Sequence, residues 1–87
     1  MNAIGLVETR GLTSAAEALD SMAKAANIRC LDLKRVGSGL ITVIIEGDVA
    51  DVNSAVEIGK SAPNRVGGEL ISSNVIPRPH SELEKLM

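Results

Sequence analysis

The sequence predicts an α+β domain of the ferredoxin-like sandwich type in the order βαββαβ, with an antiparallel four-stranded sheet, two helices on one face and a short C-terminal helix. Three observations support this fold class. Six segments alternate between strand-like and helix-like apolar patterns, and a Gly37-Ser38-Gly39 turn separates the two central strand-like segments. The length of 87 residues gives room for a single domain over 1–87, and 45% hydrophobic with 23% charged residues is typical of globular proteins.

The first strand and the first helix occupy the N-terminal third of the chain. Residues 3–8 are apolar and rich in small and β-branched side chains, which predicts a strand. Ser14 and Glu17 have the spacing of a capping box, so a helix is expected to begin there and to end near Asn27. The apolar face of this helix is formed by Ala15, Leu19, Met22 and Ala26.

A hairpin is the clearest turn in the chain. Residues 28–36 and 40–46 are predicted strands joined at Gly37-Ser38-Gly39, where two glycines supply the positive φ values of a tight turn. The second of these strands is apolar at nearly every position, which indicates burial on both faces or at an interface. A partner subunit is the simplest cover for the sheet face that the helices leave open.

The second half of the chain predicts one more helix and one more strand. The helix is expected to begin after Asp48, a suitable N-cap, and to stop at Pro63, which has no backbone N–H to continue the ladder. Two adjacent glycines then turn the chain into a strand over 70–76, and residues 80–87 are predicted to form one or two helical turns. The inward face of the second helix is expected to hold Val49, Val52, Val56 and Gly59.

Composition argues against several classes of function. Nine Lys plus Arg against eleven Asp plus Glu give a net charge of -2, and the absence of Phe, Trp and Tyr removes the base-stacking platform of most single-strand nucleic-acid binders. The chain shows neither a charged leader with a long apolar run nor an apolar stretch long enough to span a membrane. A soluble cytoplasmic protein without nucleic-acid or membrane partners is therefore expected. The thin core that remains without aromatic residues favours oligomerisation.

Residue types for catalysis are scarce. The sequence has one histidine, His80, one cysteine, Cys30, and no metal-ligand spacing, so no catalytic residue, metal or cofactor is expected. Cys30 is expected to be a small buried hydrophobic residue rather than a reactive thiol. Glu8, Glu46 and Glu69 fall at predicted strand ends or turns and are expected to be solvated rather than paired.

On local grounds the Gly37-Ser38-Gly39 segment suits a plain hairpin turn or, through exposed backbone N–H groups, a contact with a ligand. The Walker pattern is absent, and so is a GxGxxG segment before a helix. Lys34 and Arg35 directly precede the turn, so its surroundings are expected to be basic.

Five short segments follow one another in a recognisable order and spacing. They are Gly5-Leu-Val-Glu8-Thr-Arg-Gly11, Lys24-Ala-Ala-Asn27, Val36-Gly-Ser-Gly39, Gly47-Asp48-Val49 and Val75-Ile-Pro-Arg78-Pro-His80. Together they cover essentially the whole chain, which resembles the single-domain, hexamer-forming shell proteins of bacterial microcompartments (BMC).

This resemblance implies a BMC domain whose six copies form a flat hexagonal disc. Such discs tile, with other shell proteins, into the facets of a polyhedral shell around a set of enzymes in the bacterial cytoplasm. In the family, the loop matching Gly37, Ser38 and Gly39 lines a central pore for small polar metabolites. The edge contacts between hexamers would involve Lys24, Asn27 and Arg78. The alternative from another class is a small ferredoxin-like regulatory domain, a dimer or trimer that holds an effector at the glycine turn.

The chain departs from the family at several positions. Leu33 stands where an aromatic residue is common and Lys34 where an acidic one is common, so the approach to the pore is expected to be more positive and to favour anionic solutes. Pro63 and Asn74 replace a frequent alanine and a frequent histidine. The ending from Val75 to His80 is more similar to the shells of catabolic compartments than to those of carboxysomes.

Overall fold

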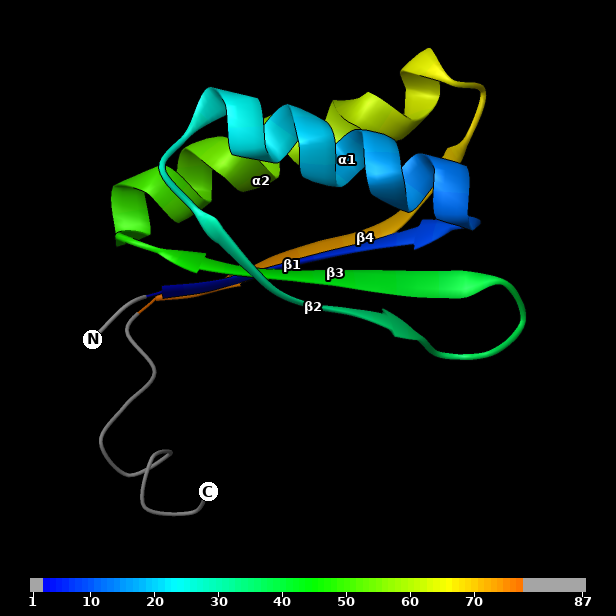
Figure 1. The fold of residues 1–87 in the computed structure, drawn as a ribbon, viewed down its shortest axis with the longest axis horizontal. Helices are drawn as coiled ribbons and strands as arrows, with labels where there is room; N and C mark the ends of the chain where they lie inside the picture. Colours follow the sequence, from blue (N-terminus) through cyan, green and yellow to red (C-terminus); the bar gives the residue numbers. More distant parts are fainter. Residues whose placement is uncertain (1–2, 78–87) are drawn as a thin grey trace.

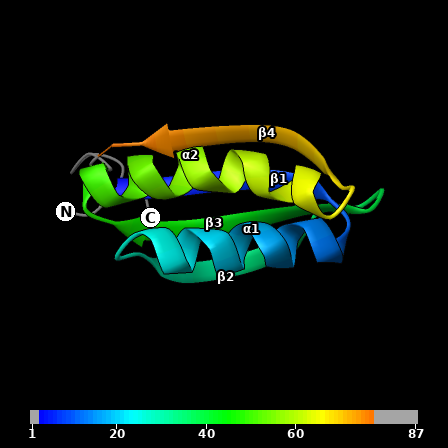
Figure 2. The ribbon, with the colours of Figure 1, turned by 90° about the horizontal axis from the view of Figure 1, so that it is seen from above.

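The computed structural model describes residues 3–77, which form β1 (Ala3–Arg10), α1 (Leu12–Ala25), β2 (Arg29–Arg35), β3 (Leu40–Gly47), α2 (Val49–Arg65) and β4 (Glu69–Ile76). The strands make one antiparallel sheet in the order β2-β3-β1-β4. Both helices cover the same face of this sheet (Figure 1), α1 on the side of β2 and β3 and α2 on the side of β1 and β4 (Figure 2). The predicted βαββαβ sandwich is confirmed. The helical turns predicted over 80–87 lie outside the described residues.

The core lies between the sheet and the helices, and its buried hydrophobic residues are alanine, valine, isoleucine and methionine. Alternate residues of β1 and β3, such as Val7, Val43 and Ile45, point toward the helices and are fully buried. Met22 of α1 and Val52 of α2 meet them from above and are also fully buried. The predicted inward faces of the helices are largely confirmed, with Ala15, Met22, Val52, Val56 and Gly59 buried and with Leu19 and Ala26 partly buried, but Val49 is 42% exposed.

The start of α1 differs from the capping-box prediction. The N-cap is Gly11, the helix begins at Leu12, and the backbone N–H of Ala15 donates to the Gly11 carbonyl at 3.3 Å. Ser14 is therefore inside the first turn and is buried at 3% exposure beneath Gly68. The prediction failed because the serine packs against another segment instead of capping its own helix. Asp48 does occupy the N-cap position of α2, without a side-chain capping bond.

Pro63 does not stop α2, which continues to Arg65. Pro63 removes one backbone hydrogen bond and its ring crowds the carbonyl four residues earlier, but only two helical residues follow it, so the disruption stays at the end of the helix. The carbonyl of Pro63 accepts hydrogen bonds from the N–H groups of Val66 at 3.1 Å and Gly68 at 2.8 Å, which closes the helix. Pro63 is fully buried, so its ring also fills space in the core.

The second face of the sheet carries no helix in the described part of the chain (Figure 1). Ile4 and Leu6 of β1 and Ile44 of β3 are half-buried on this face. β2 is an edge strand with almost every side chain exposed, and its register against β3 shifts between Cys30 and Asp32. Cys30 is consequently exposed, and the prediction of a buried thiol is wrong.

Candidate functional site

The loop over residues 37–39 joins β2 to β3 through three successive left-handed residues. The φ values are 83° at Gly37, 52° at Ser38 and 77° at Gly39. A Cβ added at either glycine would meet nothing within 4 Å, so the backbone conformation, and not lack of space in the chain, requires glycine there. The turn is closed by the Leu40 N–H donating to the Gly37 carbonyl at 2.9 Å and the Val36 N–H donating to the Leu40 carbonyl at 3.0 Å.

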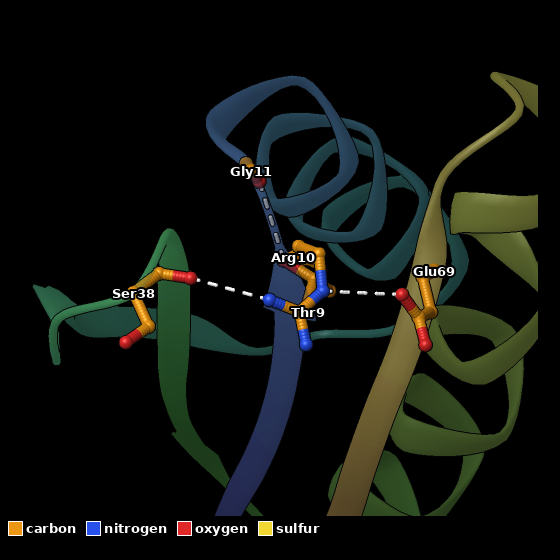
Figure 3. Close-up of polar contacts among 5 residues, drawn as sticks. All are labelled: Thr9, Arg10, Gly11, Ser38 and Glu69. Atoms are coloured by element: carbon orange, nitrogen blue, oxygen red, sulfur yellow. Dashed lines mark hydrogen bonds and ion pairs between the residues drawn. The ribbon is translucent and has the colours of Figure 1, made fainter.

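Ser38 is the only non-glycine residue with a positive φ among residues 3–77. A left-handed conformation of this kind costs about 1–3 kcal/mol and persists where surrounding contacts impose it. Arg10, at the end of β1, supplies one such contact, because its Nη1 donates to the Ser38 carbonyl at 3.2 Å (Figure 3). The Nε of the same side chain donates to Glu69 Oε1 at 3.1 Å. Sequence reasoning named Ser38 but missed Arg10 as its partner.

The surroundings of the loop carry the expected basic residues. Lys34 and Arg35 are both exposed on the last part of β2. Arg35 borders a hollow of about 210 Å³ between the loop and the start of α1, whose other walls include Gly11, Leu12 and Leu40. Arg10 adds a third cationic side chain, which Glu69 partly balances. The loop thus combines exposed backbone, one hydroxyl and a net positive environment.

Lys24 and Asn27 lie together at the far end of α1. Lys24 is in the last helical turn, with its side chain 77% exposed and its Nζ 3.0 Å from Asp20 Oδ2. Asn27 is exposed and borders a polar hollow of about 290 Å³ that also involves Glu46 and Asp48. A Cβ on Gly47 would be 2.9 Å from the Asn27 carbonyl, so this glycine lets the two segments pack closely.

The β2–β3 loop and the C-terminal end of α1 lie at opposite ends of the sheet (Figure 1). At one end Ala3 pairs with Gly47 and Ile4 with Ile76, near Asn27. At the other end Arg10 pairs with Leu40 and Glu69, next to the loop over 37–39. The eight residues of β1 between these ends span roughly 24 Å at the usual rise of a strand. Arg78 and His80 lie outside the described residues.

The three acidic residues predicted to be solvated all have partners. Glu69 bonds Arg10, and Glu46 forms an ion pair with Arg29. The Glu8 carboxylate accepts hydrogen bonds from Thr42 Oγ1 and Ser72 Oγ, each at 3.3 Å, and so links three neighbouring strands. These are structural contacts on the open face and edges of the sheet. Among residues 3–77, no three His, Cys, Asp or Glu side chains gather as a metal site would require, and no helix is long and apolar enough to cross a membrane.

Comparison with known proteins decides the family. The family model for the BMC domain matches residues 3–79. The bacterial microcompartment shell protein PduA of Citrobacter freundii is 48% identical over 85 residues, which cover 98% of this chain and 90% of that protein. The chain belongs to the BMC domain family.

Other relatives of this BMC domain protein include the carboxysome shell protein CcmK2 of Synechocystis, 46% identical over 86 residues that cover 98% of this chain and 84% of that protein. The crystal structure of a microcompartment protein from Desulfitobacterium hafniense superimposes with a TM-score of 0.81 at 37% identity, covering 94% of this chain. The BMC domain protein spans 44% of the length of that chain.

These findings confirm the expected family of shell proteins and its fold, and they give no support to a regulatory ligand-binding domain. Relatives named for the carboxysome and for other microcompartments are similar to nearly the same degree, at 46% and 48% identity.

Proposed function

We propose that this chain is a single-domain structural tile of a microcompartment shell and has no catalytic activity. Six copies form a ring in which residues 37–39 surround a central pore. The outer edge of each ring, with Lys24, Asn27 and Arg78, contacts neighbouring rings and other shell proteins. The assembled shell encloses enzymes in the bacterial cytoplasm, and small polar metabolites pass through the pore.

The placement of the two candidate regions at opposite ends of one sheet carries this proposal. A closed ring with six-fold symmetry needs one end of each subunit near the axis and the other at the rim. The loop over 37–39 projects at one end of β1, while the C-terminal end of α1 lies near the other (Figure 1). Lys24 is in the last turn of α1, and Asn27 lies beside Gly47, which pairs with the first residue of β1. A chain of this shape can line a pore and form an edge at the same time.

The open face of the sheet supports assembly into an oligomer. Ile4, Leu6 and Ile44 leave apolar surface half-exposed there, and β2 presents an unpaired edge. A core without aromatic residues gives a chain of this size limited stability on its own. Burying the open face against neighbouring copies provides additional stabilisation.

The residues near the loop favour anionic solutes. Arg10, Lys34 and Arg35 surround it, against Glu69 as the nearby acidic partner. Repeated six times around an axis, this arrangement gives the opening a positive potential that attracts anions. A comparison of the permeation of a carboxylate and of a neutral analogue of similar size tests this point. Equal permeation of the two would contradict it.

The Ser38→Leu variant tests the position of the pore. An apolar side chain at the tip of the loop is expected to narrow and dry the opening and to reduce metabolite flux through assembled shells, while the fold and the native mass stay unchanged. Ser54→Leu, at an exposed position of α2, is the matched control and is expected to leave flux unchanged. Unchanged flux in the folded Ser38→Leu shells would place the pore elsewhere.

A further inference from the structure

Arg10 lies where three parts of the chain meet. It ends β1, and its guanidinium bonds the Ser38 carbonyl in the β2–β3 loop at 3.2 Å and Glu69 at the start of β4 at 3.1 Å (Figure 3). A guanidinium is planar and holds several donors in a fixed fork, so it can bond two acceptors in different directions at once. One side chain therefore fixes the loop relative to two strands.

The position of Glu69 depends on an irregularity in β4. Glu8 pairs with Ser72, but Thr9 pairs with Leu70, so one residue of β4 is skipped between them. Without this bulge Arg10 would pair with Leu70 instead of Glu69. Bulges of this kind commonly redirect a side chain. The bulge thus brings the carboxylate to the cationic residue that hydrogen-bonds the loop.

All three carbonyl groups of the loop are hydrogen-bonded within the chain. The Gly37 carbonyl accepts from the Leu40 N–H at 2.9 Å, the Ser38 carbonyl from Arg10 at 3.2 Å, and the Gly39 carbonyl from the Gly11 N–H at 2.7 Å. Arg10 is the only side chain among these three donors. Because the other two bonds are between backbone groups, Arg10 is the one partner that a substitution can remove directly.

The hydrogen-bond donors of the loop stay available. Among the described residues, no hydrogen bond uses the N–H groups of Gly37, Ser38 or Gly39. The Ser38 hydroxyl lies on the side of the residue away from Arg10, while its carbonyl oxygen faces Arg10 (Figure 3). The loop therefore offers a solute three backbone N–H groups and one hydroxyl, whereas each of its three backbone carbonyls already accepts one hydrogen bond.

We infer that Arg10 is a positioning residue that keeps this loop a surface on which available donors outnumber available acceptors, and that the loop thereby favours solutes with oxygen acceptors, such as carboxylates, over solutes that only donate. The selection step rests on the proposed pore, whereas the positioning of the loop does not. If Arg10 is lost, the Ser38 carbonyl is freed and the left-handed residue loses a contact that holds it. Each opening would then present six additional acceptors, one Ser38 carbonyl from each copy.

Hydrogen exchange measured by mass spectrometry tests the positioning step on the assembled protein. In Arg10→Gln, the amides of Gly11 and Leu40 are expected to exchange roughly threefold to tenfold faster, because the loop that they bond opens more often. Amides in the middle of β3 are expected to keep their rates. Arg10→Lys keeps the positive charge but lacks the two-directional donors of a guanidinium, so exchange rates between those of the native protein and Arg10→Gln are expected. Glu69→Gln should also accelerate exchange at Leu40.

The matched control is Lys60→Gln. Lys60 also forms an exposed ion pair, with Glu57 at 3.1 Å, but it lies on α2. Its loss is expected to leave exchange at Gly11 and Leu40 unchanged. Unchanged exchange at these two amides in Arg10→Gln, or acceleration that is equal throughout the chain, would overturn the positioning role.

Ion selectivity tests the second step. With hexamers in a planar lipid membrane and a gradient of ethylammonium acetate, the reversal potential gives the permeability ratio of an acceptor anion to a donor cation. The native protein is expected to favour acetate, and Arg10→Gln to lower this ratio at least roughly threefold, with Arg10→Lys lowering it less. Suppose that Ser38→Leu abolishes the conductance, so that the ions do pass through the proposed pore. An unchanged permeability ratio in Arg10→Gln would then overturn the inference about Arg10 but not the proposed pore. If Ser38→Leu also conducts like the native protein, the proposed pore itself fails.

Discussion

Gly59 of α2 lies directly against Met22 of α1, since a Cβ on Gly59 would be 2.7 Å from the Met22 Sδ and 2.9 Å from its Cγ. Both residues are buried, and the absent side chain lets the helices pack closely. Gly59→Val is expected to lower the free energy of unfolding by about 1–3 kcal/mol, because overpacking displaces Met22 or separates the helices. Urea denaturation at fixed protein concentration measures this loss. The control Ser54→Val, on the exposed face of α2, should change stability by less than about 0.5 kcal/mol, and equal losses would contradict the packing argument.

Gly68 packs on Ser14 in a similar way. A Cβ on Gly68 would overlap the Ser14 hydroxyl and lie 2.9 Å from the Ser14 Cβ. Gly68→Ala is expected to cost about 1–3 kcal/mol of unfolding free energy in the native chain and clearly less in a Ser14→Gly variant, where both atoms are gone. A double-mutant cycle by urea denaturation measures the coupling. Additive effects would show that the two residues do not constrain each other.

Substitutions in the loop over 37–39 distinguish the energetic cost of a left-handed backbone from the cost of steric overlap. Gly39→Ala is expected to lower the free energy of unfolding by about 1–2 kcal/mol although nothing lies within 4 Å of the added atom, because φ is 77° there. Ser38→Gly, at a φ of 52°, is expected to keep stability within about 1 kcal/mol of the native value or to raise it. Thermal unfolding of both variants checks this, and a neutral Gly39→Ala would contradict the conformational explanation.

If Lys24 lies at the contact between hexamers, its replacement should weaken the assembly of hexamers into sheets and leave each hexamer intact. Lys24→Ala removes only an exposed pair with Asp20 within its own helix, worth about 0.3–0.5 kcal/mol, so the fold and the hexamer should remain. Extended sheets seen by electron microscopy should become smaller or disappear. Lys60→Ala, which removes a comparable exposed pair on α2, is the control. Normal sheets in Lys24→Ala would count against the placement of this residue at the edge.

The sequence predicted the strands and helices to within a few residues because their signals are local. Alternating apolar residues, the glycine turn over 37–39 and Asp48 before α2 each act within one element, and the structure places each element where they indicate. The resemblance of five short segments then identified the family, which comparison confirmed. Local patterns were sufficient for this part.

The errors arose where distant segments meet. Ser14 matched a capping box but is buried under Gly68, and Pro63 matched a helix stop but is fully buried in the core. The pairing of Arg10 with Glu69 joins residues 59 positions apart and depends on a bulge in β4 that no local pattern reveals. The exposure of Cys30 likewise follows from the position of β2 at the edge of the sheet. Register and edge positions are properties of the assembled sheet, so single-sequence reasoning missed them.

The native mass of the purified protein, measured at low and at high concentration, tests the central claim most directly. A hexameric tile predicts a species of six 9.1 kDa copies, about 55 kDa, that gives way to extended sheets as the concentration rises. A stable dimer or trimer over the whole concentration range would contradict the tile and the pore built on it.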